Sequence, residues 1–247
     1  MVAAIIQARM GSTRFPGKSA RLLSGLSILE HIINRLQQVS EIDLIQLATT
    51  QAKSESSLIE IAKSRKVAVF QGSEEDVLER FIQAGESIGA QHIIRVCGDN
   101  PLIDIPLLRS LITAHIESNA DYTLPADSIP LGVGCEVVRL ETLKNIGIHA
   151  CDTKYREHVT TWFHDHSDKF TITRVEVPSY LKKCDFRLTV DTPEDFALME
   201  KIFSHFNLSS SSSSIDLEAV IKFLKSHPEI ASLNSNIEQK DWRTKNQ

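Results

Sequence analysis

Apolar and polar positions alternate along the chain with two periods. Short runs of apolar, mostly β-branched residues are separated by longer segments in which apolar residues recur every three or four positions. The short runs predict buried strands, and the longer segments predict amphipathic helices. Residues 2–6 form the first predicted strand, and residues 28–39 form the first helix, whose apolar face holds Ile28, Leu29, Ile32, Ile33 and Leu36. The chain is therefore expected to be an α/β protein, built from βαβ units around a mostly parallel sheet.

This alternation is regular up to about residue 106 and less regular after it. Further strands are expected at residues 44–48, 67–70 and 92–96, with helices at 58–65 and after Ser73. In the second half of the chain, strands are expected at residues 122–124, 136–139, 170–177 and 186–190. We expect these later strands to complete the sheet and to build a lid.

The last part of the chain combines a well-marked helix start with a low-complexity run. A helix to about residue 205 is predicted by an N-cap, a proline at the first helical position and an acidic first turn, supplied by Thr192, Pro193, Glu194 and Asp195. Six serines at 209–214 predict a flexible connector before a helix at 217–225, and the tail from about Asn234 is expected to fray. We therefore divide the chain into a main domain (1–206), a serine-rich linker (207–215) and a C-terminal helical appendage with its tail (216–247).

Composition and charge narrow the class of protein. The chain has 247 residues, of which 42% are hydrophobic and 24% are charged, as in ordinary globular proteins. Its net charge of −5 provides no general attraction for nucleic acid or anionic lipid, so any phosphate binding must be local. We expect neither a nucleic-acid partner nor a membrane partner.

The cysteines and the N-terminus indicate a cellular compartment. The four cysteines lie far apart and form no CxxC pair, which argues against a zinc knuckle or a redox motif and favours reduced thiols. The apolar run at the N-terminus is too short for a signal sequence, and no later run approaches the length of a membrane span. These features predict a cytoplasmic protein.

A loop of small and basic residues, 8–18, follows the first strand directly. Ligands of open α/β sheets bind at the carboxyl ends of the strands, which is where this loop should lie. Small residues let backbone N–H groups approach a phosphate, while Arg9, Arg14 and Lys18 supply positive charge. The spacing does not fit a Walker A loop, because five residues separate the two glycines. The loop predicts a polyphosphate site, with a solvated basic turn as the alternative.

Two aspartates follow further predicted strands. Asp99 lies in the turn after residues 92–96, and Asp191 follows residues 186–190. Mg²⁺ prefers one or two protein carboxylates and takes its remaining oxygens from phosphate and water. We therefore expect these two residues to hold Mg²⁺ beside a nucleotide. The alternative is that Asp99 only forms a turn and that Asp191 only caps the helix after it.

Several motifs, in a fixed order, give the chain a specific resemblance. They are IIQARMGSTR and FPGK within residues 5–18, GSEEDVL at 72–78, GDNP at 98–101, REHVT at 156–160 and LTVDTPED at 188–195. In this order the motifs resemble the cytidylyltransferase family, which includes the synthetases of CMP-activated 3-deoxy-manno-octulosonate and CMP-sialic acid, and in particular its branch of spore-coat polysaccharide biosynthesis proteins. The match spans about residues 2–205. It implies a three-layer α/β/α nucleotidyltransferase sandwich, Rossmann-like, with a mostly parallel central sheet.

The resemblance also implies an activity and a set of site residues. The enzyme would transfer CMP from CTP to a sugar, such as a 2-keto-3-deoxy sugar acid or a related bacterial sugar, and release pyrophosphate during surface polysaccharide synthesis. Asp99 and Asp191 would bind Mg²⁺ and, together with Arg9, Arg14 and Lys18, carry the catalysis. The nucleotide-binding residues would be Ala8, Arg9, Gly11, Ser12, Arg14, Lys18, Thr49, Thr50, Arg95 and Asp99. A homodimer is implied as well.

The acceptor side is expected to use Glu136, Arg156 and His158, with Arg156 able to grip a carboxylate in a bidentate manner. The segment 131–136 lacks the acidic residue that often precedes position 136 in the family, so the identity of the acceptor stays open. Two other classes of protein stay open as well. One is a glycosyltransferase that uses a nucleotide sugar, although the usual DxD-like motif is missing at Asp99. The other is a non-catalytic nucleotide-binding protein.

Overall fold

Seven strands form one central sheet in the computed structural model, which describes residues 1–206 and 215–238. Residues 207–214, with the predicted serine connector, lie outside the described part. Across the sheet, the strands are β5 (Ala68–Gly72), β4 (Leu44–Thr50), β1 (Val2–Gln7), β6 (His92–Cys97), β8 (Glu136–Arg139), β7 (Tyr122–Pro125) and β9 (Ile172–Val175). All neighbours pair in parallel except β8, which is antiparallel to both β6 and β7. The predicted mostly parallel sheet is confirmed.

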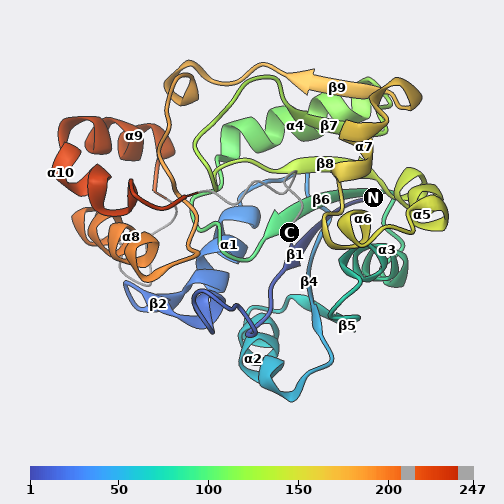
Figure 1. Ribbon diagram of the computed structural model, residues 1–247, viewed down its shortest axis with the longest axis horizontal. Coiled ribbons are helices and arrows are strands. Elements are labelled where there is room, and N and C mark those ends of the chain that lie inside the picture. Colours follow the sequence, from blue (N-terminus) through green and yellow to red (C-terminus); the bar gives the residue numbers. More distant parts are fainter. Residues whose placement is uncertain (207–214, 239–247) are drawn as a thin grey trace.

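Helices cover both faces of this sheet (Figure 1). In β1, Val2, Ala4 and Ile6 pack into one hydrophobic cluster, while Ala3 and Ile5 pack into the other. A strand buried on both faces is apolar at every position, as parallel sheets require. The first cluster includes α1 (Ile28–Leu36), α2 (Ser56–Ser64), α4 (Ile105–Glu117), α8 (Pro193–His205) and α9 (Leu217–Ser226). The second includes α3 (Val77–Ser87), α5 (Leu140–His149), α6 (Thr153–Glu157) and α7 (Thr161–Asp165). The result is the expected three-layer sandwich.

Side-chain caps determine where the important helices begin. The hydroxyl of Ser27 accepts from the N–H of Glu30 at 3.2 Å, and the Glu30 carboxylate accepts from the N–H of Ser27 at 2.7 Å. This reciprocal pair starts α1, which ends at Leu36 rather than at residue 39. The start of α8 is the predicted one, because Thr192 caps it, Pro193 is its first residue and Asp195 completes a second capping box.

The expected strand at 186–190 does not join the sheet. It is an extended segment that runs beside a loop, and its one ladder contact is a parallel bridge from Arg187 to Leu131. Its backbone bonds go to Leu131 and, from the N–H of Val190, to the carbonyl of Asp99 at 2.9 Å. Leu188 and Val190 are fully buried. The strand expectation was therefore wrong. A buried extended segment that pairs with no strand has the same apolar sequence pattern as a buried strand.

The C-terminal appendage packs against the main domain. Apolar side chains of α9 and of the short helix α10 (Pro228–Ala231) belong to the first hydrophobic cluster, and the 3₁₀ turn η5 (Ser232–Asn234) contacts α8. Asn234 is only 3% exposed. The expectation that the tail frays from about this residue is therefore wrong at Asn234 itself, while residues 239–247 of the tail lie outside the described part. Within residues 1–206 and 215–238, no helix has both the length and the apolar character needed to span a bilayer.

We expect Gly132→Ala to destabilise the fold more than Gly25→Ala. Both glycines have positive φ, +95° and +90°, so both alanines would carry a similar strain of about 1–2 kcal/mol. A Cβ at Gly132 would also lie 2.4 Å from the carbonyl oxygen of Leu188, whereas nothing lies within 4 Å of a Cβ at Gly25. In urea unfolding, Gly132→Ala should lose about 2 kcal/mol more than Gly25→Ala. Equal losses would contradict this close approach.

Candidate functional site

A polar cleft of about 260 Å³ lies where the ends of β1 and β6 meet the loop of residues 8–18. Its lining consists of Gln7, Ala8, Arg9, Ser12, Thr13, Arg14, Lys18, Ser19, Gly98, Asp99 and Asp191. The two strand ends approach closely because residue 98 is a glycine: a Cβ there would lie 2.5 Å from the Cβ of Ala8. The predicted basic loop and both strand-end aspartates thus share one cleft at the carboxyl edge of the sheet.

Three contacts hold the basic loop in shape. The carboxylate of Glu55, which is 2% exposed, accepts from the N–H of Met10 at 3.2 and 3.1 Å and from the hydroxyl of Thr49 at 2.8 Å. The N–H of Gly17 donates to the carbonyl of Met10 at 3.0 Å and closes the loop. The side chain of Phe15 is buried in the first hydrophobic cluster. The loop is therefore anchored before any ligand binds, which keeps its cations in place.

Lys18 lies between the two aspartates. Its ammonium nitrogen donates to Oδ2 of Asp99 at 2.5 Å and to Oδ1 of Asp191 at 2.7 Å. The three side chains are mostly buried, with exposures of 12%, 21% and 15%. Because both carboxylate oxygens lie within hydrogen-bonding distance of one nitrogen, they converge on a single point.

The other oxygen of Asp191 faces two guanidinium groups. Oδ2 accepts from Nη2 of Arg187 at 2.8 Å and lies 3.1 Å from Nη2 of Arg14. Arg187 in turn is held by Asp195, with Nε 2.8 Å from Oδ1 of that carboxylate. These contacts fix the orientation of the Asp191 carboxylate, so that Oδ1 is the oxygen presented to Lys18.

The pKa values of this cluster follow from the competition between burial and charge. Burial alone would lower the pKa of Lys18, but Asp99 and Asp191 outweigh it and raise that pKa above its usual value. Burial would raise the pKa of Asp191, but Lys18, Arg14 and Arg187 bring it below its usual value. Lys18 and Asp191 are therefore both charged at neutral pH.

Asp99 and Asp191 fit a magnesium ion. Their oxygens already converge on one cation, the Lys18 ammonium, and two carboxylates are the protein ligands that Mg²⁺ prefers. Within the described residues, no group of three or more His, Cys, Asp or Glu side chains is placed to hold a metal. An ion bound here would therefore take its remaining oxygens from phosphate and water, as Mg²⁺ does beside nucleotides.

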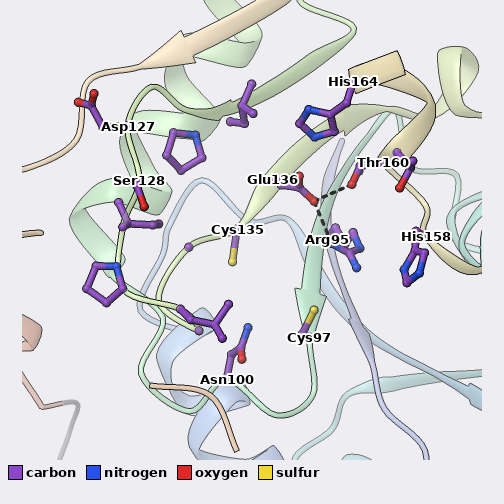
Figure 2. Close-up of a pocket in the computed structure, with 18 residues that line it drawn as sticks. Arg95, Cys97, Asn100, Asp127, Ser128, Cys135, Glu136, His158, Thr160 and His164 are labelled. Atoms are coloured by element: carbon purple, nitrogen blue, oxygen red, sulfur yellow. Dashed lines mark hydrogen bonds and ion pairs between the residues drawn. The ribbon is translucent and has the colours of Figure 1, made fainter. Parts of the chain in front are cut away.

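A second pocket, of about 420 Å³, borders the same turn (Figure 2). Gly98 and Asp99 line the cleft, while Cys97 and Asn100 line this pocket. The two cavities therefore lie on either side of four consecutive residues.

Polar side chains from two paired strands point into the second pocket (Figure 2). Nη1 of Arg95 on β6 donates to Oε2 of Glu136 on β8 at 2.9 Å, and the hydroxyl of Thr160 donates to the same oxygen at 3.1 Å. The Tyr122 hydroxyl donates to Oε1 of Glu136. Glu136 is thus held by three donors at the wall of the pocket.

The residues predicted to bind the nucleotide do not all lie in the cleft. The cleft receives Ala8, Arg9, Ser12, Arg14, Lys18 and Asp99, and Gly11 belongs to the same loop. Arg95 instead lines the second pocket. Thr49 and Thr50, at the end of β4, are 0% and 1% exposed, and Thr49 uses its hydroxyl to hold Glu55. These two threonines lie beneath the surface rather than in the lining of the cleft.

Of the residues predicted for the acceptor, Glu136 and His158 lie together in the second pocket, and Arg156 does not. Nε of Arg156 donates to Oδ2 of Asp76 at 2.7 Å, and Nη1 donates to the carbonyl of Gly147 at 2.9 Å. Arg156 therefore ties α6 to the N-cap of α3.

Sequence reasoning missed Glu55, Arg187 and Asn234 and assigned Asp195 only to the first turn of a helix. Arg187 carried a signal, because in an extended segment it lies on the same side as Asp191, four positions later. Glu55 and Asn234 carried no local signal, since Glu55 holds Met10, 45 positions away, and Asn234 holds Asp195, 39 positions away.

The chain matches known proteins over most of its length. A family model described as cytidylyltransferase matches residues 3–227. Spore coat polysaccharide biosynthesis protein SpsF of Bacillus subtilis is 34% identical over 232 residues, which cover 92% of this chain and 95% of that protein. The structure of a cytidylyltransferase from Leptospira borgpetersenii serovar Hardjo-bovis has a TM-score of 0.85 at 28% identity, covering 96% of this chain and 99% of that one. CMP:2-keto-3-deoxy-manno-octonic acid synthetase, solved with CTP, shares the fold with a TM-score of 0.63 at 17% identity, covering 83% and 98%.

Glu55→Gln should loosen the basic loop and leave the sheet intact. A glutamine side chain has one oxygen where glutamate has two, and its NH₂ group would face the N–H of Met10 or the hydroxyl of Thr49, which are themselves donors. The variant should therefore lose about 1–3 kcal/mol of the free energy of unfolding. Urea unfolding measures this loss. Glu60→Gln is the matched control, because Glu60 is exposed on the neighbouring helix α2, and it should change stability by less than about 0.5 kcal/mol. Losses of the same size in both variants would contradict the role assigned to Glu55.

Proposed function

The chain belongs to the cytidylyltransferase family, and we propose that it transfers CMP from CTP to a sugar and releases pyrophosphate. One observation carries the proposal: the cleft that gathers Lys18, Asp99 and Asp191 shares its turn with a second pocket, into which Arg95 and Glu136 point. Two substrates on either side of one turn would bring an attacking hydroxyl next to a triphosphate. This geometry favours group transfer over nucleotide binding alone, and the family favours it over a glycosyltransferase.

The triphosphate of CTP is assigned to the cleft. Arg9 and Arg14 are 45% and 36% exposed there, so their guanidinium groups are accessible to phosphate oxygens. Asp99 and Asp191 would hold Mg²⁺, which supplies charge neutralisation at the phosphates. The cations of the loop stabilise the negative charge that develops on the departing pyrophosphate, and such charge stabilisation is the main source of rate in phosphoryl-type transfers.

The bond changes in this transfer are simple. The hydroxyl oxygen of the sugar forms a bond to the α-phosphorus of CTP. The bond from that phosphorus to the oxygen bridging to the β-phosphate breaks, and its electron pair leaves with pyrophosphate. The hydroxyl proton passes to water. No covalent enzyme intermediate is required, so the protein acts by holding the two substrates in line and by neutralising charge.

We assign the sugar to the second pocket, called the acceptor pocket from here on, and propose a 2-keto-3-deoxy sugar acid or a related sugar of surface polysaccharides. Arg95 supports an acid, because its side chain lines this pocket and is 25% exposed, so its guanidinium group can donate to a carboxylate there. Thr160 and Thr161 add hydroxyl groups to the lining. The names of SpsF and of the 2-keto-3-deoxy-manno-octonic acid synthetase support the same class.

Pyrophosphate release tests the proposal directly. The protein with Mg²⁺ is assayed with each of CTP, UTP, ATP and GTP against a panel of 2-keto-3-deoxy sugar acids and neutral sugars. We expect release with CTP and an acid, and loss of release when EDTA removes the metal. Release with UTP alone, or no CTP binding, would overturn the proposal.

The same assay includes variants of the metal-binding carboxylates. Asp99→Asn and Asp191→Asn should each lower kcat by about 100-fold or more, as expected for groups that act on developing charge. Glu194→Gln is the matched control, since Glu194 is exposed and near Asp191, and it should stay within about twofold of the parent.

Arg95 and Arg156 can be distinguished by matched lysine variants. Arg95→Lys keeps the charge but loses the guanidinium fork, so KM for the acceptor should rise about tenfold or more while KM for CTP stays nearly constant. Arg156→Lys should leave both constants within about threefold, because Arg156 lies outside the acceptor pocket and is paired with Asp76. The reverse result would place Arg156 at the acceptor.

A further inference from the structure

The C-terminal appendage reaches the edge of the site through one buried side chain. Asn234, at the end of η5, donates from Nδ2 to the carbonyl oxygen of Arg187 at 3.0 Å and to Oδ1 of Asp195 at 2.7 Å. Its residue exposure is 3%. A buried amide that binds two acceptors belonging to another part of the chain restricts both of them.

Asp195 transmits this contact to Asp191 in two ways. Its carboxylate, which is fully buried, accepts from Nε of Arg187 at 2.8 Å and from Nη2 at 3.1 Å. Oδ2 of Asp195 also accepts from the backbone N–H of Asp191 at 2.9 Å. Asp195 therefore holds both the backbone of Asp191 and the guanidinium that binds the Asp191 side chain.

Arg187 sets the orientation of the Asp191 carboxylate. Because Nη2 of Arg187 binds Oδ2 at 2.8 Å, Oδ1 remains directed to the point shared by Lys18 and Asp99. A rotated or displaced Arg187 would leave that carboxylate with less restraint when a polyphosphate attracts Lys18 and Arg14.

We propose that Asn234 is a positioning residue, through which the appendage holds Asp195 and Arg187 so that Asp191 keeps the orientation needed to bind the metal. The inference rests on the proposed function. It means that the appendage helps to form the site, although Asn234 lies 39 and 47 positions from the two residues that it holds. Partners that orient a metal ligand from behind typically change metal affinity by about 10- to 100-fold when they are removed.

The chemistry of an amide suits this place. An amide donates two hydrogen bonds without adding charge, and the two acceptors here are a carbonyl and a carboxylate. Leucine has a similar size but no donor, so it would leave both acceptors short of a partner. Aspartate has the same shape, but it would place a second carboxyl group against Asp195.

The experiment measures metal binding in the full-length protein. Binding of Mn²⁺ is followed by electron paramagnetic resonance in the presence of CTP, for the parent, Asn234→Leu and Asn234→Asp, and thermal unfolding is recorded for each. Val220→Ala is the matched control, because Val220 is fully buried on α9 of the same appendage and has no polar side-chain atom to join this network. It weakens the packing of the appendage while the hydrogen bonds of Asn234 remain.

We expect the Asn234 variants to bind Mn²⁺ about tenfold more weakly or worse than the parent, and Val220→Ala to bind within about twofold of it. The Mg²⁺ concentration that gives half-maximal pyrophosphate release should shift in the same order. Unchanged Mn²⁺ binding in folded Asn234 variants, or an equal change in Val220→Ala, would overturn the inference alone. Unfolding of both Asn234 variants would overturn it too, since the role would then be structural. A parent protein that binds no Mn²⁺ with CTP would instead remove the proposed metal site.

Discussion

The arrangement of the site depends on one ionic contact, that of the Lys18 ammonium with the carboxylates of Asp99 and Asp191. Charged side chains with so little exposed surface need partners, because an unpaired buried charge costs several kcal/mol. The contact joins residues separated by 81 and 173 positions. Three segments must therefore end at one place: the loop after β1, the turn after β6 and the extended segment before α8. The neighbouring positions of β1 and β6 in the sheet supply the first two.

The part of the site that could be predicted from sequence is the part that follows from strand order. A loop after β1 and an aspartate after β6 must meet at the carboxyl edge of a parallel sheet, so Lys18 and Asp99 could be assigned to one cleft in advance. Side-chain direction was harder to predict. Arg95 shares a strand face with Cys97, and that face opens into the acceptor pocket instead of the cleft. Arg156 finds its partner, Asp76, 80 positions away, and no local pattern reports such a pairing.

Two other features could not be predicted, because a sequence pattern indicates whether a residue is buried but not which residues it packs against. Residues 186–190 have the apolar character of a strand, yet they pack beside the loop at Leu131 and join no sheet. Asn234 is polar and near the end of the chain, which indicates exposure, but its two acceptors are inside the protein. The predicted homodimer stays a prediction, since it concerns surfaces that the fold of one chain does not determine.

The distance along the chain between Lys18 and its last partner has a consequence for biosynthesis. At roughly 5–20 residues per second on the ribosome, Asp191 follows Lys18 by a delay on the order of ten to thirty seconds. During that interval β1 can already pair with β4 and β6, but the lysine lacks one of its two counter-charges. Asn234 is synthesised later still. A nascent chain can therefore have β1, β4 and β6 paired and an open cationic loop well before it has a place for a metal ion, and the contacts of the appendage with Arg187 and Asp195 are added later.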